Sequence, residues 1–460
     1  MSSSSSAPFL TSLRDAKVLI FGAGVTGAPT EEFLTEYGAQ VTVLDEKKSG
    51  SGISNSLPDL QGGKFDLAVV SPGWKLDHLW ITSVKSAGIP VLSEIDLAWR
   101  AKQELCPNQR WIGLTGTNGK TTAVQMAEAI ALSANIKSQA CGNVGTTVIE
   151  AVSAAEADLL ILELSSFQLD WSEEFQLESA AILNIAADHI DWHGSFDAYA
   201  SAKFRIASRT KKLILNASDP EITKRALHVA VPITSFSLET PAPHQIGLVE
   251  NLIVDRAFIS GDAEALFELA DVKPAAPHNV LNAMAAAALI RSIGAPAENI
   301  GPALRNFVLD HHRLEIVGEF DGTTWIDDSK ATNPHAALAA LQSQLSAIWI
   351  AGGLAKGAQM DELVKKVGSR IKAAIMIGTD APIIEGALRE HAPQVQRHMM
   401  EPSLKGAALM KEVVACAKKI AGPGDTVLLA PACASMDQFK NYAERGELFA
   451  AAVREAHNAK

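Results

Sequence analysis

The sequence predicts an α/β protein of three domains, each organised around a parallel sheet. The chain has 460 residues, and about 100–200 residues per domain would give roughly three domains. Short buried strands recur along the whole chain, and many run into a glycine-rich or polar loop that leads to a helix. Repeated strand–loop–helix units build parallel, doubly wound sheets. We therefore expect functional residues in the loops at the carboxyl ends of strands.

Composition and charge narrow the class of protein. Apolar residues make up 47% of the chain and charged residues 20%, which is ordinary for soluble globular proteins. The net charge is −12 and no basic block stands out, which argues against nucleic acid as the main partner. The four cysteines are scattered, which favours reduced core residues over a disulfide framework or a metal site. The sequence shows neither a membrane span nor a signal peptide, so we expect a cytoplasmic protein. We also expect a monomer, and a disordered tail over residues 1–15.

The first glycine-rich loop follows the earliest predicted strand, Lys17 to Phe21. Gly22-Ala-Gly-Val-Thr-Gly27 comes next, then a helical stretch, then a strand over 41–45 that ends in Asp45. This is the dinucleotide-binding fingerprint in its required strand–helix–strand context. The diphosphate would rest on the helix N-terminus, and Asp45 would reach a ribose or base. NAD, another nucleoside diphosphate and a purely structural glycine turn all remain open.

The same domain contains a second candidate loop. A buried strand over 67–70 leads into Ser71-Pro-Gly73, and another strand is expected over 89–92. These elements predict a Rossmann-like domain over residues 1–100. The polar stretch 102–109 is expected to be a linker to the next domain.

The second domain, residues 101–308, opens with a phosphate-binding loop. A strand over 111–114 precedes Gly116-Thr-Asn-Gly-Lys-Thr121, and a helix is expected from Ala123. Backbone N–H groups at such a strand-to-helix turn wrap an anion. Lys120 would bind the β- and γ-phosphates and the Thr121 hydroxyl would bind Mg²⁺. The full pattern places a glycine where Leu114 stands, so this loop is a shortened variant.

Other polar groups of this domain are expected near the phosphate loop. A buried strand over 158–163 ends in Glu163, where phosphate-loop enzymes need an acidic Mg²⁺ ligand. Asn143, in a turn, could donate to a phosphate or an attacking group. The loop Asp188 to His193 holds acids and two histidines suited to metal or substrate contact. Further polar residues have open roles: Lys203 on a helix over 196–208 would ordinarily be a solvated cation, while Asn279 and Asn282, three apart on one helix face, would hold a base or cap the helix.

The third domain, residues 309–460, again alternates strands, loops and helices. Strands are expected over 324–328, 347–351, 374–378 and 427–430. Such a series predicts a Rossmann-like, doubly wound sheet. Its candidate ligand groups stand at strand carboxyl ends, and they are Lys330, Thr332, Lys356 and Ser435.

Six blocks occur together and in order, and they resemble those of the Mur ligases, ATP-dependent enzymes that build the peptide of the bacterial cell-wall precursor. The blocks are Gly116–Thr121, Glu163–Leu169, Asp188–Asp191, His278–Asn282, His312-Arg313 and Asp328–Asn333. The resemblance covers nearly the whole chain, and it implies a UDP-binding, an ATPase and a C-terminal domain. Glu163–Leu169, Asp328–Asn333 and Pro431–Asn441 are most similar to the members that add D-glutamate to UDP-N-acetylmuramoyl-L-alanine.

The resemblance also implies roles for individual residues. For UDP it implies Gly24, Val25, Thr26, Asp45, Ser71 and Gly73. For ATP it implies Gly116, Thr117, Asn118, Gly119, Lys120, Thr121, Thr122, Asn279, Asn282, Arg313 and Asp328. For the amino acid it implies Lys330, Thr332, Lys356, Ser435, Met436 and Tyr442, with the two lysines facing the carboxylates. For catalysis it implies Lys120, Asn143, Glu163, His189 and Lys203.

Two Mg²⁺ ions are implied by the same resemblance. Their ligands would be Thr121, Glu163, His189 and a carbamylated Lys203. A carbamate suits Mg²⁺, because it is an anionic oxygen ligand whereas an ammonium repels the ion. Four positions depart from the family pattern: Leu354 and Ala355 replace an acid and a glycine, Asp327 replaces a common asparagine, and Tyr442 replaces a frequent phenylalanine.

The reaction implied is an ATP-dependent ligation through an acyl phosphate. Its rivals are another Mur-family ligase or a folylpolyglutamate-type ligase with a different amino acid, a NAD-dependent dehydrogenase, and a nucleotide switch that recruits a protein. The dehydrogenase would use Gly22–Gly27 but leave Lys120 and Glu163 without a role.

Overall fold

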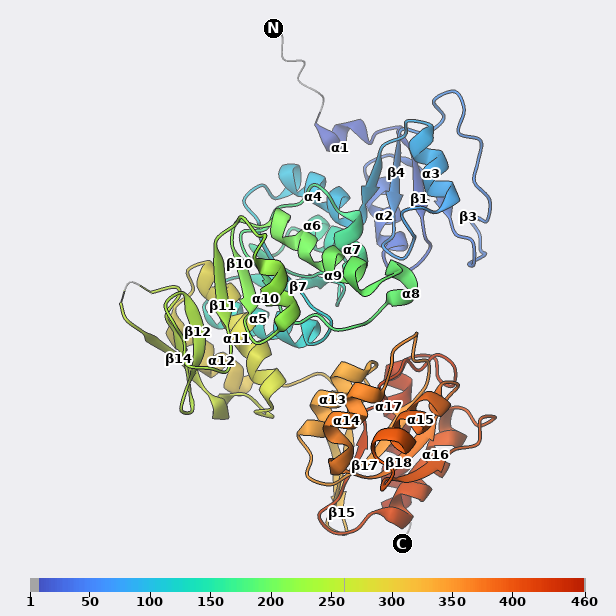
Figure 1. Cartoon of the computed structure of the whole chain (residues 1–460). Helices are drawn as coiled ribbons and strands as arrows, with labels where there is room; N and C mark the ends of the chain where they lie inside the picture. Colours follow the sequence, from blue (N-terminus) through green and yellow to red (C-terminus); the bar gives the residue numbers. More distant parts are fainter. Residues whose placement is uncertain (1–7, 260, 459–460) are drawn as a thin grey trace. The chain divides into compact units, whose positions relative to one another are not determined.

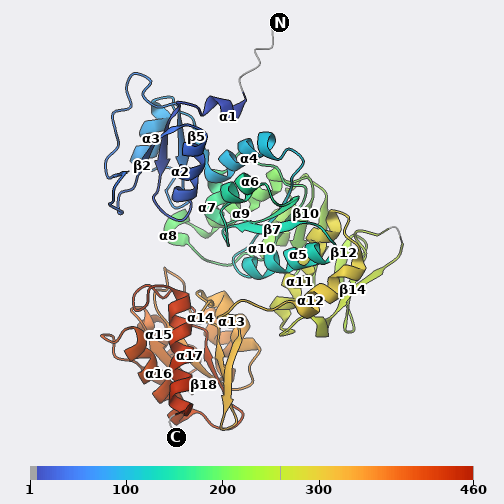
Figure 2. The same cartoon turned by 180° about the vertical axis from the view of Figure 1, so that it is seen from behind.

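The computed structural model describes residues 8–259 and 261–458. The chain forms two compact units, which are coloured along the sequence in Figures 1 and 2. One unit runs to Ile185 and resumes over Asp197–Phe307. The other combines the short segment Ala186–Phe196 with the chain from Val308 onward.

The first sheet of the larger unit is parallel, in the order β3-β2-β1-β4-β5. Its strands are β1 (Lys17–Phe21), β2 (Gln40–Leu44), β3 (Ile53–Ser54), β4 (Leu67–Val70) and β5 (Val91–Ser93). Its helices are α1 (Phe9–Ser12), α2 (Gly27–Glu36), α3 (Leu79–Ser86) and α4 (Glu94–Leu105). The predicted Rossmann-like fold is confirmed by this order. The chain runs outward from β1 to β3 on one side and then continues with β4 and β5 on the other side of β1, so the switch point lies between β1 and β4. The Gly22–Gly27 loop follows β1 at this switch point.

Two expectations for this region were wrong. Residues 8–15 are not a disordered tail: Leu13 is buried, and the backbone N–H groups of Phe9 and Leu10 donate to the Glu104 carboxylate. Residues 1–7 lie outside the described part. The expected linker at 102–109 is helical through Leu105, because the Lys102 stem is buried and its ammonium donates to the Pro107 carbonyl. A polar side chain with a long apolar stem can be buried in this way.

The second sheet has the order β14-β13-β12-β11-β10-β9-β6-β8-β7. The strands from β7 to β12 in this order run parallel, whereas β12 with β13 and β13 with β14 pair antiparallel. The strands are β6 (Arg110–Thr115), β7 (Ser138–Gly142), β8 (Leu159–Glu163), β9 (Ala180–Ile182), β10 (Leu213–Asn216), β11 (Ile233–Phe236), β12 (Gln245–Val249), β13 (Leu252–Asp255) and β14 (Glu264–Glu268).

Helices α5 and α11 pack together on this second sheet and supply much of its core. The α-helices are α5 (Lys120–Ser133), α6 (Val148–Ala154), α7 (Ser166–Trp171), α9 (Phe196–Phe204), α10 (Pro220–Ala226), α11 (Pro277–Ser292) and α12 (Ile300–Asn306). The 3₁₀ helices are η1 (Arg205–Arg209), η2 (Leu269–Asp271) and η3 (Ala297–Asn299). Because β6, β8 and β9 are neighbours, the loops that follow them meet at one edge of the sheet.

The third sheet has the order β15-β16-β20-β17-β18-β19 and is parallel except for β15. Its strands are β15 (Glu315–Phe320), β16 (Thr323–Asp327), β17 (Ala347–Gly352), β18 (Ile371–Ile377), β19 (Gln396–Met399) and β20 (Thr426–Leu429). Its unit also contains α8 (Ile190–His193), α13 (Pro334–Gln342), α14 (Asp361–Val367), η4 (Gly368–Arg370), α15 (Ala381–His391), α16 (Gly406–Ile420) and α17 (Tyr442–Asn458).

Successive side chains along the strands of this third sheet point to opposite faces and belong to two separate hydrophobic cores. Trp349 packs with α13, α14 and α15, whereas its neighbours Ile348 and Ile350 pack with α16 and α17. Helices therefore cover both faces (Figure 1), and the doubly wound fold predicted for residues 309–460 is confirmed. Within the described residues, helices long and apolar enough to cross a membrane are absent.

Candidate active site

The phosphate loop has the predicted strand–turn–helix form. β6 ends at Thr115 and α5 begins at Lys120. Gly119 caps the helix at φ +82°, and a Cβ atom on it would lie 2.3 Å from Oδ1 of Asn282. Only glycine fits, since the backbone conformation disfavours a side chain and the Asn282 amide fills the space. The first N–H groups of a helix have no acceptor within the helix, so the start of α5 forms an anion-binding turn.

Two lysines converge on one carbonyl of this loop. The Lys120 ammonium donates to the carbonyls of Gly116 and Thr117, both at 2.9 Å. The Lys203 ammonium donates to the same Gly116 carbonyl at 2.8 Å. Lys203 is almost fully buried, and its ammonium lies 4.8 Å from the ring centroid of Tyr199. Lys203 is therefore a buried cation beside the phosphate loop, not the solvated one that a helix position alone suggested.

Glu163 lies one strand away from the phosphate loop. It is the last residue of β8 and pairs with Leu114 on β6 and Gly142 on β7. Its side chain is 2% exposed. The Asn143 carboxamide donates to its Oε1 at 2.8 Å, whereas its Oε2 is buried without a hydrogen-bond partner among the described residues. A buried carboxylate oxygen without a partner is costly, and it is the kind of atom that a bound cation would satisfy.

Two asparagines support this loop, and a third fixes the turn before α11. The Asn184 amide binds the backbone of Asn118 twice: its Oδ1 accepts from the N–H at 2.8 Å and its Nδ2 donates to the carbonyl at 2.9 Å. Asn279 and Asn282 are both buried on α11. Asn279 donates to the Pro274 carbonyl at 3.2 Å, which fixes the turn before α11, while Asn282 faces Gly119. Asn282 is thus placed beside the nucleotide loop.

Sequence reasoning missed two loop-supporting residues. Asn184 and Tyr199 were not among the predicted site residues. The Tyr199 hydroxyl shares a 2.9 Å hydrogen bond with Oγ1 of Thr117. The available signal for Asn184 was its place directly after a buried strand, where parallel sheets gather their ligands. For Tyr199 no local signal existed, because its partner is distant in sequence.

The histidine loop belongs to the smaller unit. His189 lies in the segment Ala186–Phe196, so the larger unit brings together Lys120, Asn143, Glu163 and Lys203 but not His189. The His189 backbone takes a left-handed conformation at φ +51°, and its N–H donates to the Asp188 carboxylate at 2.9 Å. The segment Asp188 to His193, which was expected to be a loop, contains the one-turn helix α8.

In the first sheet, Asp45 holds the glycine-rich loop. Its carboxylate accepts from the Ala23 N–H at 3.0 Å and from the N–H groups of Lys47 and Lys48 at 2.9 Å. Burial raises the pKa of Asp45, but these donors outweigh it and leave the pKa below its ordinary value. Other members of the predicted UDP set also gather there: Thr26 donates to Oγ of Ser71 at 3.0 Å, and the Val25 side chain is exposed.

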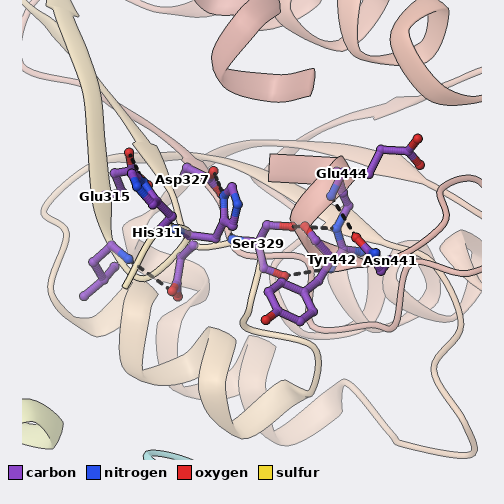
Figure 3. Close-up of polar contacts among 11 residues, drawn as sticks. His311, Glu315, Asp327, Ser329, Asn441, Tyr442 and Glu444 are labelled. Carbon is purple, nitrogen blue, oxygen red and sulfur yellow. Dashed lines mark hydrogen bonds and ion pairs between the residues drawn. The ribbon is translucent and has the colours of Figure 1, made fainter. Parts of the chain in front are cut away.

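The loops of the third sheet are joined by a polar network, shown in Figure 3. Nδ1 of His312 lies 2.6 Å from Oδ2 of Asp327, whose other oxygen accepts from the Ser329 N–H at 2.8 Å. The Leu314 N–H donates to Asp328 at 3.2 Å, and burial raises the pKa of Asp328 to about 7. Asp328, expected near ATP, thus anchors the turn that contains Arg313.

The predicted amino-acid residues follow three neighbouring strands of this sheet. The Lys330 ammonium lies 5.1 Å from the ring centroid of Tyr442. Leu354 and Ala434 exchange backbone hydrogen bonds of 2.8 and 2.9 Å, which ties the loop after β17 to the loop after β20. Leu354 therefore acts through its backbone at the position where the sequence departs from the family. Ser435 is buried and Met436 is exposed.

A cavity of 320 Å³ lies beside these loops, with Thr332 and Lys356 in its wall. Asp188 also lines it, and the Asn333 amide donates to the Asp188 carboxylate at 3.4 Å. Lys330, Ser435, Met436 and Tyr442 are not in its lining. The cavity therefore gathers two of the six residues expected around the amino acid.

A fold of three α/β sheets with a phosphate loop and a buried acid beside it defines a class of nucleotide-dependent enzyme. Two family models match the chain: Mur ligase middle domain over residues 114–290, and Mur ligase, glutamate ligase domain over residues 312–433. The chain therefore belongs to the Mur ligase family.

Curated relatives of similar length carry one name, UDP-N-acetylmuramoylalanine--D-glutamate ligase. The protein of Thermobifida fusca is 44% identical, over 96% of this chain and 99% of its own. The protein of Streptomyces coelicolor is 43% identical, over 95% of this chain and 98% of its own. Among solved structures, a pseudomurein peptide ligase type C from Methanothermus fervidus shares the fold with a TM-score of 0.61 at 19% identity, over 94% of this chain and 99% of its own. UDP-N-acetylmuramate-alanine ligase from Thermotoga maritima shares the fold with a TM-score of 0.59 at 16% identity, over 96% of this chain and 100% of its own.

Proposed function

We propose that this chain uses ATP to join D-glutamate to UDP-N-acetylmuramoyl-L-alanine, as a step in peptidoglycan precursor synthesis. The choice of substrates rests on the name of relatives that match the chain over nearly its whole length. The observation that carries the ATP chemistry is the Glu163 carboxylate, which keeps a buried, unpartnered oxygen one strand away from the phosphate loop.

The chemistry has two steps. A carboxylate is a poor acyl donor, because its leaving group would be oxide. Its oxygen therefore first attacks the γ-phosphorus of ATP, which forms an acyl phosphate and releases ADP. The amine of D-glutamate then attacks the acyl carbon, the C–O bond to phosphate breaks, and the amine loses a proton as the amide forms.

The residues of the phosphate loop would neutralise charge during the first step. The N–H groups at the start of α5 and the Lys120 ammonium would hold the β- and γ-phosphates. At present Lys120 is bound to the carbonyls of Gly116 and Thr117, so it would exchange those acceptors for phosphate oxygens. Asn143 holds one oxygen of Glu163 and thereby aims the other. Asn282 and Asn184 keep the loop in shape for this task.

The donor set fits Mg²⁺. Glu163 and the Thr121 hydroxyl would hold one ion, and His189 with a carbamylated Lys203 would hold a second. Bound Mg²⁺ supplies charge neutralisation on the transferring phosphoryl group. Carbamylation adds CO₂ to the neutral amine of Lys203 with loss of a proton, and the remaining N–H can still donate to the Gly116 carbonyl.

The other assignments are part of the same proposal. The Gly22–Gly27 loop with Ser71 and Gly73 would hold UDP. Lys330, Thr332, Lys356, Ser435, Met436 and Tyr442 would surround D-glutamate. The working protein would be a cytoplasmic monomer of three domains, residues 1–100, 101–308 and 309–460, although the first boundary falls inside helix α4.

The test is phosphate release with ATP, UDP-N-acetylmuramoyl-L-alanine and one amino acid at a time. D-glutamate should support turnover, whereas L-glutamate, L-alanine, L-lysine and diaminopimelate should not. Turnover with another of these amino acids would overturn the choice of D-glutamate. A change in absorbance at 340 nm with NAD would support a dehydrogenase, and slow ATP turnover that neither substrate stimulates would support a nucleotide switch.

A further inference from the structure

Arg445 is a buried cation that the proposed chemistry does not use. It lies in the first turn of α17 and its side chain is fully buried. Its guanidinium donates to Oγ of Ser329 at 3.0 Å, to the Ser329 carbonyl at 2.8 Å and to the Cys433 carbonyl at 3.1 Å. Burial lowers the pKa of Arg445 to about 10, so the side chain keeps its charge at neutral pH.

Among the described residues, no carboxylate forms a salt bridge with Arg445. Its hydrogen bonds go to two carbonyls and a hydroxyl, and Asp327 and Asp437 attract its charge without direct contact. A buried charge without a directly paired counter-ion is expensive, so an apolar side chain of similar size would serve packing better. The cost suggests that the guanidinium is kept for the groups that it holds.

Those groups belong to three segments of the predicted amino-acid site. Ser329 precedes Lys330, Cys433 lies two residues before Ser435, and Arg445 itself lies one turn after Tyr442. The Ser329 hydroxyl extends the connection, because it also accepts from Arg445. The same hydroxyl donates to the Tyr442 carbonyl at 2.7 Å (Figure 3). One guanidinium and one hydroxyl thus join the loop after β16, the loop after β20 and the start of α17.

We propose that Arg445 and Ser329 are positioning residues for the amino-acid substrate, because they hold Lys330, Ser435 and Tyr442 in register. The proposal rests on the proposed function, in which these side chains surround an acidic amino acid. Neither residue needs to touch the substrate.

The test compares Ser329→Ala, Arg445→Lys and Arg445→Met with the wild type. Ser329→Ala removes the hydroxyl that joins Arg445 to Tyr442, and it should raise the KM for D-glutamate roughly tenfold, the effect of one lost charge-assisted hydrogen bond. The KM values for ATP and for the sugar nucleotide should change less than about twofold on the same scale. Arg445→Met should raise the KM for D-glutamate further, and Arg445→Lys should recover part of the loss.

A second measurement separates this role from folding and from the overall function. Hydroxylamine traps an acyl phosphate as a hydroxamate, so it reports the first step without D-glutamate. Wild type and Ser329→Ala should form hydroxamate at equal rates. If the wild type forms none and uses no D-glutamate, the proposed function fails; if Ser329→Ala changes all three KM values alike, or none, only the positioning role fails.

Matched controls come from the same unit. Ser343 donates its hydroxyl to the Ala340 carbonyl at 2.7 Å, and Arg370 donates to the Gln344 carbonyl at 2.7 Å, both away from the predicted site. Ser343→Ala and Arg370→Met should leave the KM for D-glutamate unchanged. If Arg445→Met does not fold, Ser329→Ala still decides, and a normal KM for D-glutamate in that variant would overturn the proposal.

Discussion

The Asn143 carboxamide donates to Oε1 of Glu163 at 2.8 Å and leaves Oε2 of Glu163 buried without a partner among the described residues. The backbones of the two residues are also joined, since the Asn143 N–H donates to the Glu163 carbonyl at 2.9 Å. The end of β8 and the turn after its neighbour β7 thus hold the Glu163 carboxylate in a fixed orientation. This arrangement prepares a ligand before any nucleotide binds, which is the property that a phosphoryl-transfer site requires.

Replacing Glu163 with glutamine should abolish activity and spare the fold. The amide can still accept from Asn143, but it no longer offers a negative charge to Mg²⁺, so phosphate release should fall by at least about a hundredfold. The melting temperature should stay equal or rise, because a buried unpaired charge is removed. Glu178→Gln, which alters only a half-buried ion pair with Arg110, is the control for activity. Turnover near the wild-type rate would contradict the assignment of Glu163.

Lys203→Ala should likewise lose turnover while the protein remains folded. If Lys203 acts as a carbamate, wild-type activity should fall in CO₂-depleted buffer and return with bicarbonate, because carbamylation is reversible. The control is Lys212→Ala, since the Lys212 ammonium also donates to a backbone carbonyl, that of Ser292 at 3.0 Å. An activity that is independent of CO₂ would exclude the carbamate, and near-normal turnover of Lys203→Ala would exclude any essential role.

Gly119→Ala should weaken ATP binding beyond the cost of backbone strain alone. A left-handed backbone costs an alanine about 1–2 kcal/mol, and here the new Cβ atom would also collide with the Asn282 amide. Gly294→Ala has the same strain at φ +97° with open space around it, so it measures the strain alone. Calorimetric titration with ATP should show a loss for Gly119→Ala only. Equal binding by both variants would show that Asn282 can move aside.

Local patterns in the sequence predicted the phosphate loop, the position of Glu163 and the sheets. Glycine spacing and a strand that ends in an acid depend on residues close together in the chain, so they could be read without the fold. Asn184 and Arg445 could not be found in this way. Their partners lie 66 and 116 residues away, and asparagine or arginine in such places has no local signature.

The wrong expectations have the same origin. The tail was expected to be disordered, but Leu13 is buried, and the Phe9 and Leu10 N–H groups donate to Glu104, which lies far along the chain. The linker was expected from polar composition, yet Lys102 buries its stem and donates to the Pro107 carbonyl just beyond α4. For Lys203, its position on a helix alone suggested a solvated cation, whereas the resemblance implied a site residue. The fold sets its ammonium against the Gly116 carbonyl.

Asp327→Asn should make the stability of the protein less dependent on pH. The hydrogen bond that His312 donates to the Asp327 carboxylate raises the pKa of His312 and outweighs burial, which lowers it. A raised pKa in the folded state means that the stabilisation is complete below the unfolded pKa of about 6.5 and is lost as pH rises through the folded pKa. Between pH 6 and pH 8.5 the melting temperature of the wild type should therefore fall further than that of Asp327→Asn. The difference should correspond to about 1 kcal/mol in the free energy of unfolding. Asp361→Asn, which breaks the more exposed contact of 2.9 Å with His391, should leave the wild-type profile unchanged. Parallel profiles for wild type and Asp327→Asn would show that His312 is neutral in the folded protein throughout this range.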